Sequence, residues 1–231
     1  EATEKLLSAW DKETKQSRAE YIRVLISEGA NVNVKDKDGR TPLMIAAQLS
    51  STPEIVALLL EKGAELEARN TPGWTPLMIA AALSSTPEIV ALLLEKGAEV
   101  NARNTDGKTP LMFAAGESST PEIVALLIEK GAEVNARDTN GGTPLMFAAR
   151  KSSTPGIVAL LIKKGAELEA RSTNGSTPLM FAAGNSSTPE IVQLLIEKGA
   201  ELEARDTDGW TPLTAAAQLF STPTIVPLLP Q

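Results

Sequence analysis

No cysteine and no histidine occur anywhere in this 231-residue sequence. Without cysteine, the protein has no disulfide and no cysteine zinc site. Without histidine, it lacks the commonest general base and the commonest metal ligand, so a Ser-His catalytic pair is impossible. We therefore expect no enzymatic activity, no metal ion and no cofactor.

Aromatic residues are also scarce, at 3% of the chain, although 42% of its residues are hydrophobic. The core must then consist of Leu, Ile, Val and Ala. The longest apolar runs, such as Ile55 to Leu60, are far shorter than the roughly 20 residues that span a bilayer. The net charge of −7 disfavours nucleic acid and anionic membranes as partners. We expect neither nucleic-acid binding nor membrane insertion.

One short motif organises the chain. Thr-Pro-Leu-Met occupies Thr41 to Met44 and returns every 34 residues, with Thr214 in place of Met in the last copy. The copies begin at Thr75, Thr109, Thr143, Thr177 and Thr211. A fixed period of this size is typical of a stacked repeat array, which is a surface for binding.

The period predicts a single repeat domain spanning residues 1–231. Residues 1–38 form an N-terminal capping repeat and residues 209–231 a partial last repeat. Five full repeats lie between them, at Gly39–Pro72, Gly73–Asp106, Gly107–Asn140, Gly141–Asn174 and Gly175–Asp208.

The capping repeat departs from the period in its first half. Its apolar residues Leu6, Ala9 and Trp10 match the first helix of later repeats only at an offset of 37 residues. The polar segment Asp11–Ser17 is therefore predicted to be a longer connection between two helices. A cap should have one packed and one solvated face.

Each full repeat predicts two helices. Thr41 is placed to cap the first helix with its hydroxyl, and Pro42 suits the first helical position. Ser50 and Ser51 are expected in the turn, and Thr52-Pro53 is expected to start the second helix by the same device. That helix is apolar nearly all round, which predicts burial between neighbours. Gly63 is expected to end it in the left-handed conformation.

Two helices and a projecting turn, with Thr-Pro-Leu and Gly-Ala-Glu-Leu/Val-Glu/Asn-Ala-Arg, resemble the ankyrin repeat. The resemblance covers all repeats and implies an all-α solenoid of stacked helix-turn-helix repeats with projecting β-turn arms. The family period is 33 residues, one fewer than here. Met or Thr214 also replaces the histidine of the family's Thr-Pro-Leu-His motif. The tetratricopeptide repeat has 34 residues, but its Trp/Leu-Gly/Tyr pattern is missing here.

Carboxylates and arginines recur in every arm. Catalytic sites are singular, so we interpret the repeated glutamates as a solvated face, paired in part with the row Arg69, Arg103, Arg137, Arg171 and Arg205. The stretch Asp206–Gly209 resembles a Ca²⁺ loop but lacks the terminal glutamate at the required distance.

A few positions vary while the rest of the repeat stays nearly constant. With the glycine at Gly39 counted as position one, the variable positions are two, seven, ten and eleven; the last three share one face of the first helix. The resemblance implies that first helices and turn tips line a concave, partner-binding groove. The candidate residues are Arg40, Ile45, Leu49, Trp74, Ile79, Leu83, Lys108, Phe113, Glu117, Phe147, Arg150, Lys151, Phe181, Asn185 and Trp210. Because drift rarely deposits Trp and Phe on a solvated surface, we expect this face to be exposed and to bind a protein.

Two alternatives and one further expectation remain. The near-identity of the repeats also suits a designed or structural scaffold without a natural ligand, whereas linked changes such as Leu66-Glu67 against Val100-Asn101 suit gene duplication. An enzyme is a third class, which the lack of histidine and cysteine disfavours.

Pro227 and Pro230 interrupt the last helix and leave Leu219 and Phe220 with few residues to cover them. We expect this end to fray or to pair with another copy of the chain.

Overall fold

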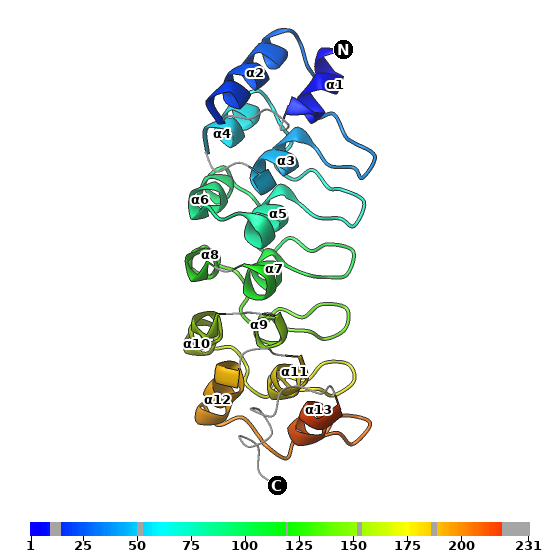
Figure 1. Cartoon of the computed structure of the whole chain (residues 1–231), viewed down its shortest axis with the longest axis vertical. Helices are drawn as coiled ribbons and strands as arrows, with labels where there is room; N and C mark the ends of the chain where they lie inside the picture. The colour runs from blue at the N-terminus through cyan, green and yellow to red at the C-terminus, as the bar shows by residue number, and fades with distance from the viewer. Residues whose placement is uncertain (10–14, 50–52, 119, 152–153, 186–188, 219–231) are drawn as a thin grey trace. The chain divides into compact units, whose positions relative to one another are not determined.

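The computed structural model describes residues 1–9, 15–49, 53–118, 120–151, 154–185 and 189–218. Every regular element within these ranges is an α-helix. The chain divides into two compact parts, residues 1–105 and residues 106–231, each of which is described by itself. We call them the N-terminal part and the C-terminal part (Figure 1).

The N-terminal part contains the capping repeat and two full helix pairs. Its helices are α1 (Ala2–Leu7), α2 (Lys15–Ser27), α3 (Pro42–Leu49), α4 (Pro53–Glu61), α5 (Pro76–Leu83) and α6 (Pro87–Glu95). The first helices α3 and α5 pack side by side, while α4 lies between α2 and α6 in a second row. Figure 1 shows the arms projecting beside the first helices.

The C-terminal part repeats this arrangement. Its helices are α7 (Pro110–Glu117), α8 (Pro121–Glu129), α9 (Pro144–Lys151), α10 (Pro155–Lys163), α11 (Pro178–Asn185), α12 (Pro189–Glu197) and α13 (Pro212–Gln218). The first helices pack in the order α7, α9, α11, α13, and α10 packs between α8 and α12.

The threonine of each Thr-Pro-Leu motif caps its helix, as predicted. The Thr75 hydroxyl accepts a hydrogen bond from the Met78 amide at 3.3 Å, and Thr109 does the same for Met112 at 3.4 Å. The methionine of the motif also takes part in capping, which the sequence did not indicate. Its sulfur accepts from the threonine amide at 3.5 Å in both helices, where a glutamate would complete a capping box.

The second helix starts at a Thr-Pro pair as predicted, with the proline in its first turn, but the threonine hydroxyl does not cap it. Thr86 and Thr120 occupy the N-cap positions of α6 and α8, but neither side chain makes a cap hydrogen bond. Instead the hydroxyls of Ser84 and Ser118 accept from the Thr86 and Thr120 amides at 3.0 Å. The serine two residues upstream therefore accepts the hydrogen bond at this junction, which agrees with the turn role predicted for the first serine, at Ser84 and Ser118.

Each second helix ends at a left-handed glycine, as predicted. Gly97 has φ of 93°, its amide donates to Leu94, and the Ala98 amide donates to Leu93. This pair of bonds is the Schellman arrangement. A Cβ at Gly97 would meet nothing within 4 Å, so glycine is needed for its backbone conformation and not for space.

The core is mainly aliphatic, as the composition predicted, and also contains methionines such as Met78 and Met112. Leu77, Ala80 and Ala81 of α5 are at most 1% exposed, and Ile89 and Leu93 of α6 are fully buried. The second helices lie between neighbours, as predicted, but they are less completely buried than their apolar sequences indicate. Leu58, Leu60, Leu92 and Leu94 are partly exposed, although α4 packs against α2, α3 and α6.

The capping repeat agrees with its predicted packing where the structure describes it. Leu6 and Ala9 are fully buried, and Trp10 lies outside the described residues. Helix α2 begins at Lys15, so the predicted connection Asp11–Ser17 is too long at its C-terminal end. At the other end of the chain, Leu219, Phe220, Pro227 and Pro230 lie outside the described residues.

Successive arms are joined by hydrogen bonds from arginine side chains to backbone carbonyls. The guanidinium Nη1 atoms of Arg69, Arg137 and Arg171 donate to the carbonyl oxygens of residues 103, 171 and 205, one repeat onward, at 2.6–2.7 Å. The arginines were expected to pair with glutamates. Arg137 does approach Glu167, at 3.8 Å, but these carbonyl bonds are shorter and carry the register of the arms.

Candidate binding surface

The structure corrects the expected exposure of position seven. Ile45, Ile79 and Phe113 are 8%, 3% and 8% exposed, so they belong to the core. Phe147 and Phe181 are partly exposed. Position seven faces the neighbouring first helix. Among the residues at this position in the described repeats, Phe147 and Phe181 alone are partly exposed.

In the N-terminal part the exposed candidates are aliphatic. Leu49 and Leu83, at the ends of the adjacent helices α3 and α5, are 52% and 49% exposed. Arg40 is held by Asp36, which its Nε reaches at 2.8 Å. Burial alone would raise the pKa of Asp36, but hydrogen bonds from the Arg40 main chain and guanidinium outweigh it and lower that pKa. Trp74 is partly buried.

In the C-terminal part the equivalent ends of α7 and α9 are charged. Glu117 at the end of α7 is paired with Lys151 at the end of α9, one repeat away. Asn185 ends α11, and its side chain lies outside the described residues. Trp210 is 37% exposed on the last arm.

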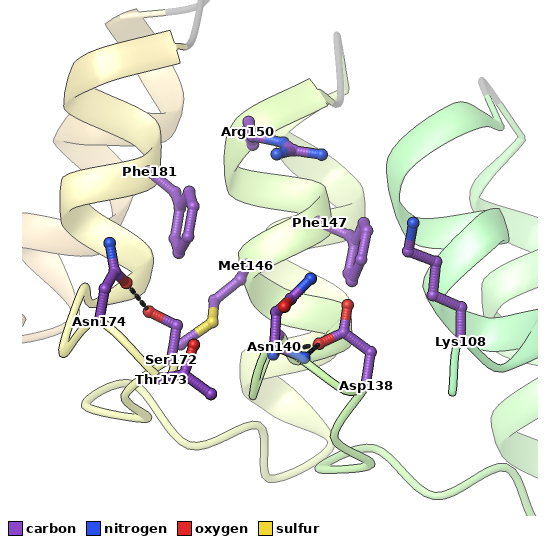
Figure 2. A pocket seen from close by; sticks show the side chains of 11 residues that line it. Lys108, Asp138, Asn140, Met146, Phe147, Arg150, Ser172, Thr173, Asn174 and Phe181 are labelled. Atoms are coloured by element: carbon purple, nitrogen blue, oxygen red, sulfur yellow. Dashed lines mark hydrogen bonds between the residues drawn. The ribbon is translucent and has the colours of Figure 1, made fainter. Parts of the chain in front are cut away.

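A hollow of about 350 Å³ opens between the first helices and the arms of the C-terminal part (Figure 2). We call it the central hollow. It is lined by Lys108, Asp138, Asn140, Gly142, Met146, Phe147, Arg150, Ser172, Thr173, Asn174 and Phe181. Figure 2 shows the Phe147 ring between Lys108 and Phe181, with Arg150 one turn further along α9.

Gly142 leaves this hollow open. The same position holds Arg40, Trp74, Lys108 and Trp210 in four other repeats and Ser176 in the fifth, so Gly142 lacks the long side chain that most repeats have here. Gly142 does not have a positive φ, and its backbone therefore does not require glycine. A Cβ would lie 3.0 Å from an Asp138 carboxylate oxygen.

Two cations face the Phe147 ring. Lys108 Nζ lies 5.7 Å and Arg150 Cζ 5.8 Å from the ring centroid, within the range of cation–π attraction. Lys108 is also 3.4 Å from Asp106. The Asp138 carboxylate holds its own turn, accepting from the Gly142 amide at 2.7 Å and the Asn140 amide at 2.9 Å.

A second hollow, of about 200 Å³, continues from the first. It shares Asn174 and Phe181 with the central hollow and is also lined by Asp206, Asp208 and Trp210. The Asp206 carboxylate accepts from the Trp210 amide at 2.8 Å. Phe147, Phe181 and Trp210 therefore mark one groove, with Lys108, Asp138 and Arg150 at one end and Asp206 and Asp208 at the other.

Sequence reasoning missed several lining residues. Asp138, Asn140 and Ser172–Asn174 belong to turns and looked like ordinary turn residues, and Met146 looked like core. The signal that was available is Gly142, at a position that holds a long side chain in four of the other five repeats.

The described residues contain no group of three His, Cys, Asp or Glu side chains placed to hold a metal ion. Within the same ranges, no helix is both long enough and apolar enough to cross a membrane.

Pairs of short helices, stacked and joined by arms that bond to one another, define this protein as a helical repeat protein. The family model for ankyrin repeats, in three copies, matches residues 14–104, 81–172 and 145–230. The chain therefore belongs to the ankyrin-repeat family, which confirms the resemblance and the all-α repeat fold. No curated protein sequence matches the chain. Ankyrin repeats are generally protein–protein interaction modules and typically non-catalytic.

Proposed function

We propose that this protein is a non-catalytic scaffold that binds a protein partner on the face formed by its first helices and turn tips. The carrying observation is the central hollow, where two partly exposed rings, Phe147 and Phe181, flank an opening beside Arg150. Aromatic residues and arginine dominate the binding energy of protein interfaces when they line such pockets. The second helices α4, α6, α8, α10 and α12 contain no aromatic residue, and their most exposed positions are charged residues such as Glu61 and Lys163.

The proposed face is tested by capture of partners with matched variants. The immobilised full chain is exposed to a lysate of the organism that encodes it, and retained proteins are quantified by mass spectrometry. A protein retained by wild type should be bound at least about tenfold more weakly by Phe147→Ala, because truncating a buried anchor costs about 2 kcal/mol or more.

Ala159→Glu on α10 is the control and should leave binding unchanged. Gln193 occupies the equivalent position of α12, so a long polar side chain fits there. Loss of binding in Ala159→Glu with none in Phe147→Ala would place the partner on the second helices and refute the proposed face.

The second candidate is a designed or structural scaffold with no natural ligand, which the near-identity of the repeats favours. It is supported if no protein is retained more strongly by wild type than by Phe147→Ala. A third occupant of the exposed surface is another copy of the chain, joined through the C-terminal repeat. Analytical ultracentrifugation tests it, since a sedimentation coefficient independent of concentration excludes self-association.

A further inference from the structure

We infer that the central hollow takes an extended acidic peptide segment, in which a large apolar side chain lies next to a carboxylate. This inference rests on the proposed function and adds the chemistry of the partner. It combines three observations: the space above Gly142, the two aromatic rings, and the two cations on Phe147.

The apolar part of the segment fits between the rings. Phe147 and Phe181 stand on neighbouring helices, with Met146 of α9 between them in Figure 2. The opening of about 350 Å³ is near the lower end of the range for ligand pockets, so it suits one or two side chains of a peptide. An aromatic or leucine side chain placed there would stack against both rings.

The carboxylate is selected by Arg150. Within the described ranges, Arg150 contacts the Phe147 ring and makes no ion pair or hydrogen bond. A guanidinium that lies over a ring keeps its N–H groups free for a planar carboxylate, which it binds through two parallel hydrogen bonds. The nearby Asp138 carboxylate is engaged by backbone amides of its own turn.

A cationic ligand fits the same place poorly. The Phe147 ring already faces Lys108 and Arg150, so a third cation would meet two like charges. The hollow is therefore not a cage for lysine or arginine of a partner.

A polyanion also fits poorly. Asp206 and Asp208 line the adjoining hollow, and the whole chain has a net charge of −7. A nucleic acid that reached Arg150 would bring further phosphates toward these carboxylates. A peptide can place one carboxylate at Arg150 and a neutral or basic residue beside Asp208. The exposed side chains of Asn140 and Asn174 offer donors and acceptors to its main chain.

The test is a selection from displayed random 12-residue peptides on the immobilised full chain, followed by sequencing. We expect Asp or Glu to be enriched within two residues of Phe, Trp, Tyr or Leu. The most enriched peptide is then synthesised with a fluorescent label, and its dissociation constant is measured by fluorescence polarisation on variants whose thermal unfolding matches wild type.

Arg150→Gln should weaken this peptide at least tenfold. Lys163→Gln removes one positive charge from the exposed end of α10 and should change binding less than twofold. Gly142→Trp should abolish binding by filling the hollow. Trp210 beside Asp206 shows that this turn accepts tryptophan four residues after aspartate.

Four results would overturn the inference. They are no enrichment, enriched peptides without carboxylates, equal effects of Arg150→Gln and Lys163→Gln, and tighter binding of a labelled single-stranded 12-mer DNA than of any peptide. A lack of enrichment does not contradict the proposed face, because the library contains no folded partner. Enriched peptides without carboxylates, or equal effects of Arg150→Gln and Lys163→Gln, do not contradict that face either, provided that Gly142→Trp still blocks binding. Peptides that bind Gly142→Trp as well as wild type would count against the inference and the proposed face together.

Discussion

At the scale of single residues, the arm position of Asn135 and Glu169 holds asparagine in some repeats and glutamate in others. The two residue types differ in their hydrogen bonds. Asn135 accepts from the Glu167 amide at 2.8 Å and donates to the Gly165 carbonyl at 2.9 Å. Glu169, one repeat later, accepts from the Glu201 amide at 2.9 Å, but its other oxygen is buried without a partner. Burial raises the pKa of Glu169, the Glu201 charge adds to this, and the hydrogen bond from the Glu201 amide opposes it.

Glu169→Asn should stabilise the protein at pH 7. A carboxyl whose pKa is raised by folding contributes stability at low pH that is lost as pH rises through the folded pKa. At pH 7 the substitution removes this cost and restores the donor seen at Asn135, for a gain of about 0.5–1.5 kcal/mol. Urea unfolding should show a smaller gain at pH 4. The control Asn135→Glu should destabilise at pH 7, and a loss of stability in Glu169→Asn would contradict the argument.

Phe147 and Leu145 should differ in their effects on folding. Leu145 is fully buried, so Leu145→Ala leaves a cavity and should cost roughly 2–5 kcal/mol. Phe147 is partly exposed, so Phe147→Ala should lower the free energy of unfolding by less than Leu145→Ala does. Denaturant unfolding of the two variants measures this. A larger loss in Phe147→Ala would mean that its ring serves the core and not a partner.

At the scale of the helices, short length makes the ends important. Helices α5 and α6 have 8 and 9 residues, fewer than an isolated helix needs in water. Their stability comes from neighbours in the stack and from satisfied end groups. The end groups of the two helices are satisfied differently. At α5 the hydroxyl of the N-cap residue Thr75 accepts the hydrogen bond, whereas before α6 the accepting hydroxyl belongs to Ser84.

Thr75→Ala should therefore cost about 1 kcal/mol, the usual loss for an N-cap hydroxyl. Thr86→Ala, at the N-cap of α6, should cost about 0.5 kcal/mol or less, because its side chain makes no cap bond. Ser84→Ala should resemble Thr75→Ala. Thermal and urea unfolding of the three variants give the comparison, and equal losses for Thr75→Ala and Thr86→Ala would show that the hydrogen bonds seen at α5 contribute nothing.

At the scale of the whole molecule, the sequence predicts one array of coupled repeats in residues 1–231, and the structure contains two compact parts. In a repeat array each repeat is stabilised by its neighbours, so unfolding spreads along the chain. Coupling between the parts can be tested without isolating either one.

Leu77→Ala in the N-terminal part and Leu145→Ala in the C-terminal part should each shift a single urea transition of the full chain. Both residues are buried, at 1% and 0% exposure. Circular dichroism and tryptophan fluorescence should report the same midpoint in each variant. Two separate transitions, with each variant shifting only one, would show that the parts unfold independently and would refute the single array.

The sequence by itself determined the family and most of the local structure. Thr75 and Gly97 were predictable because a helix cap and a left-handed turn depend on residues within about four positions of each other. The 34-residue period then placed every copy of these signals. The aliphatic core followed from the composition, and the variable positions indicated where the candidate surface lies.

Only the tertiary structure decided which of those variable positions a partner can reach. Burial of Phe113 and exposure of Phe147 follow from how adjacent first helices pack, although both residues hold the same position in the repeat. The bond from Arg137 to the carbonyl of residue 171 and the hollow above Gly142 also arise between side chains of successive repeats. Contacts at this separation depend on the shape and volume of the neighbouring side chains, which a repeating local pattern does not specify.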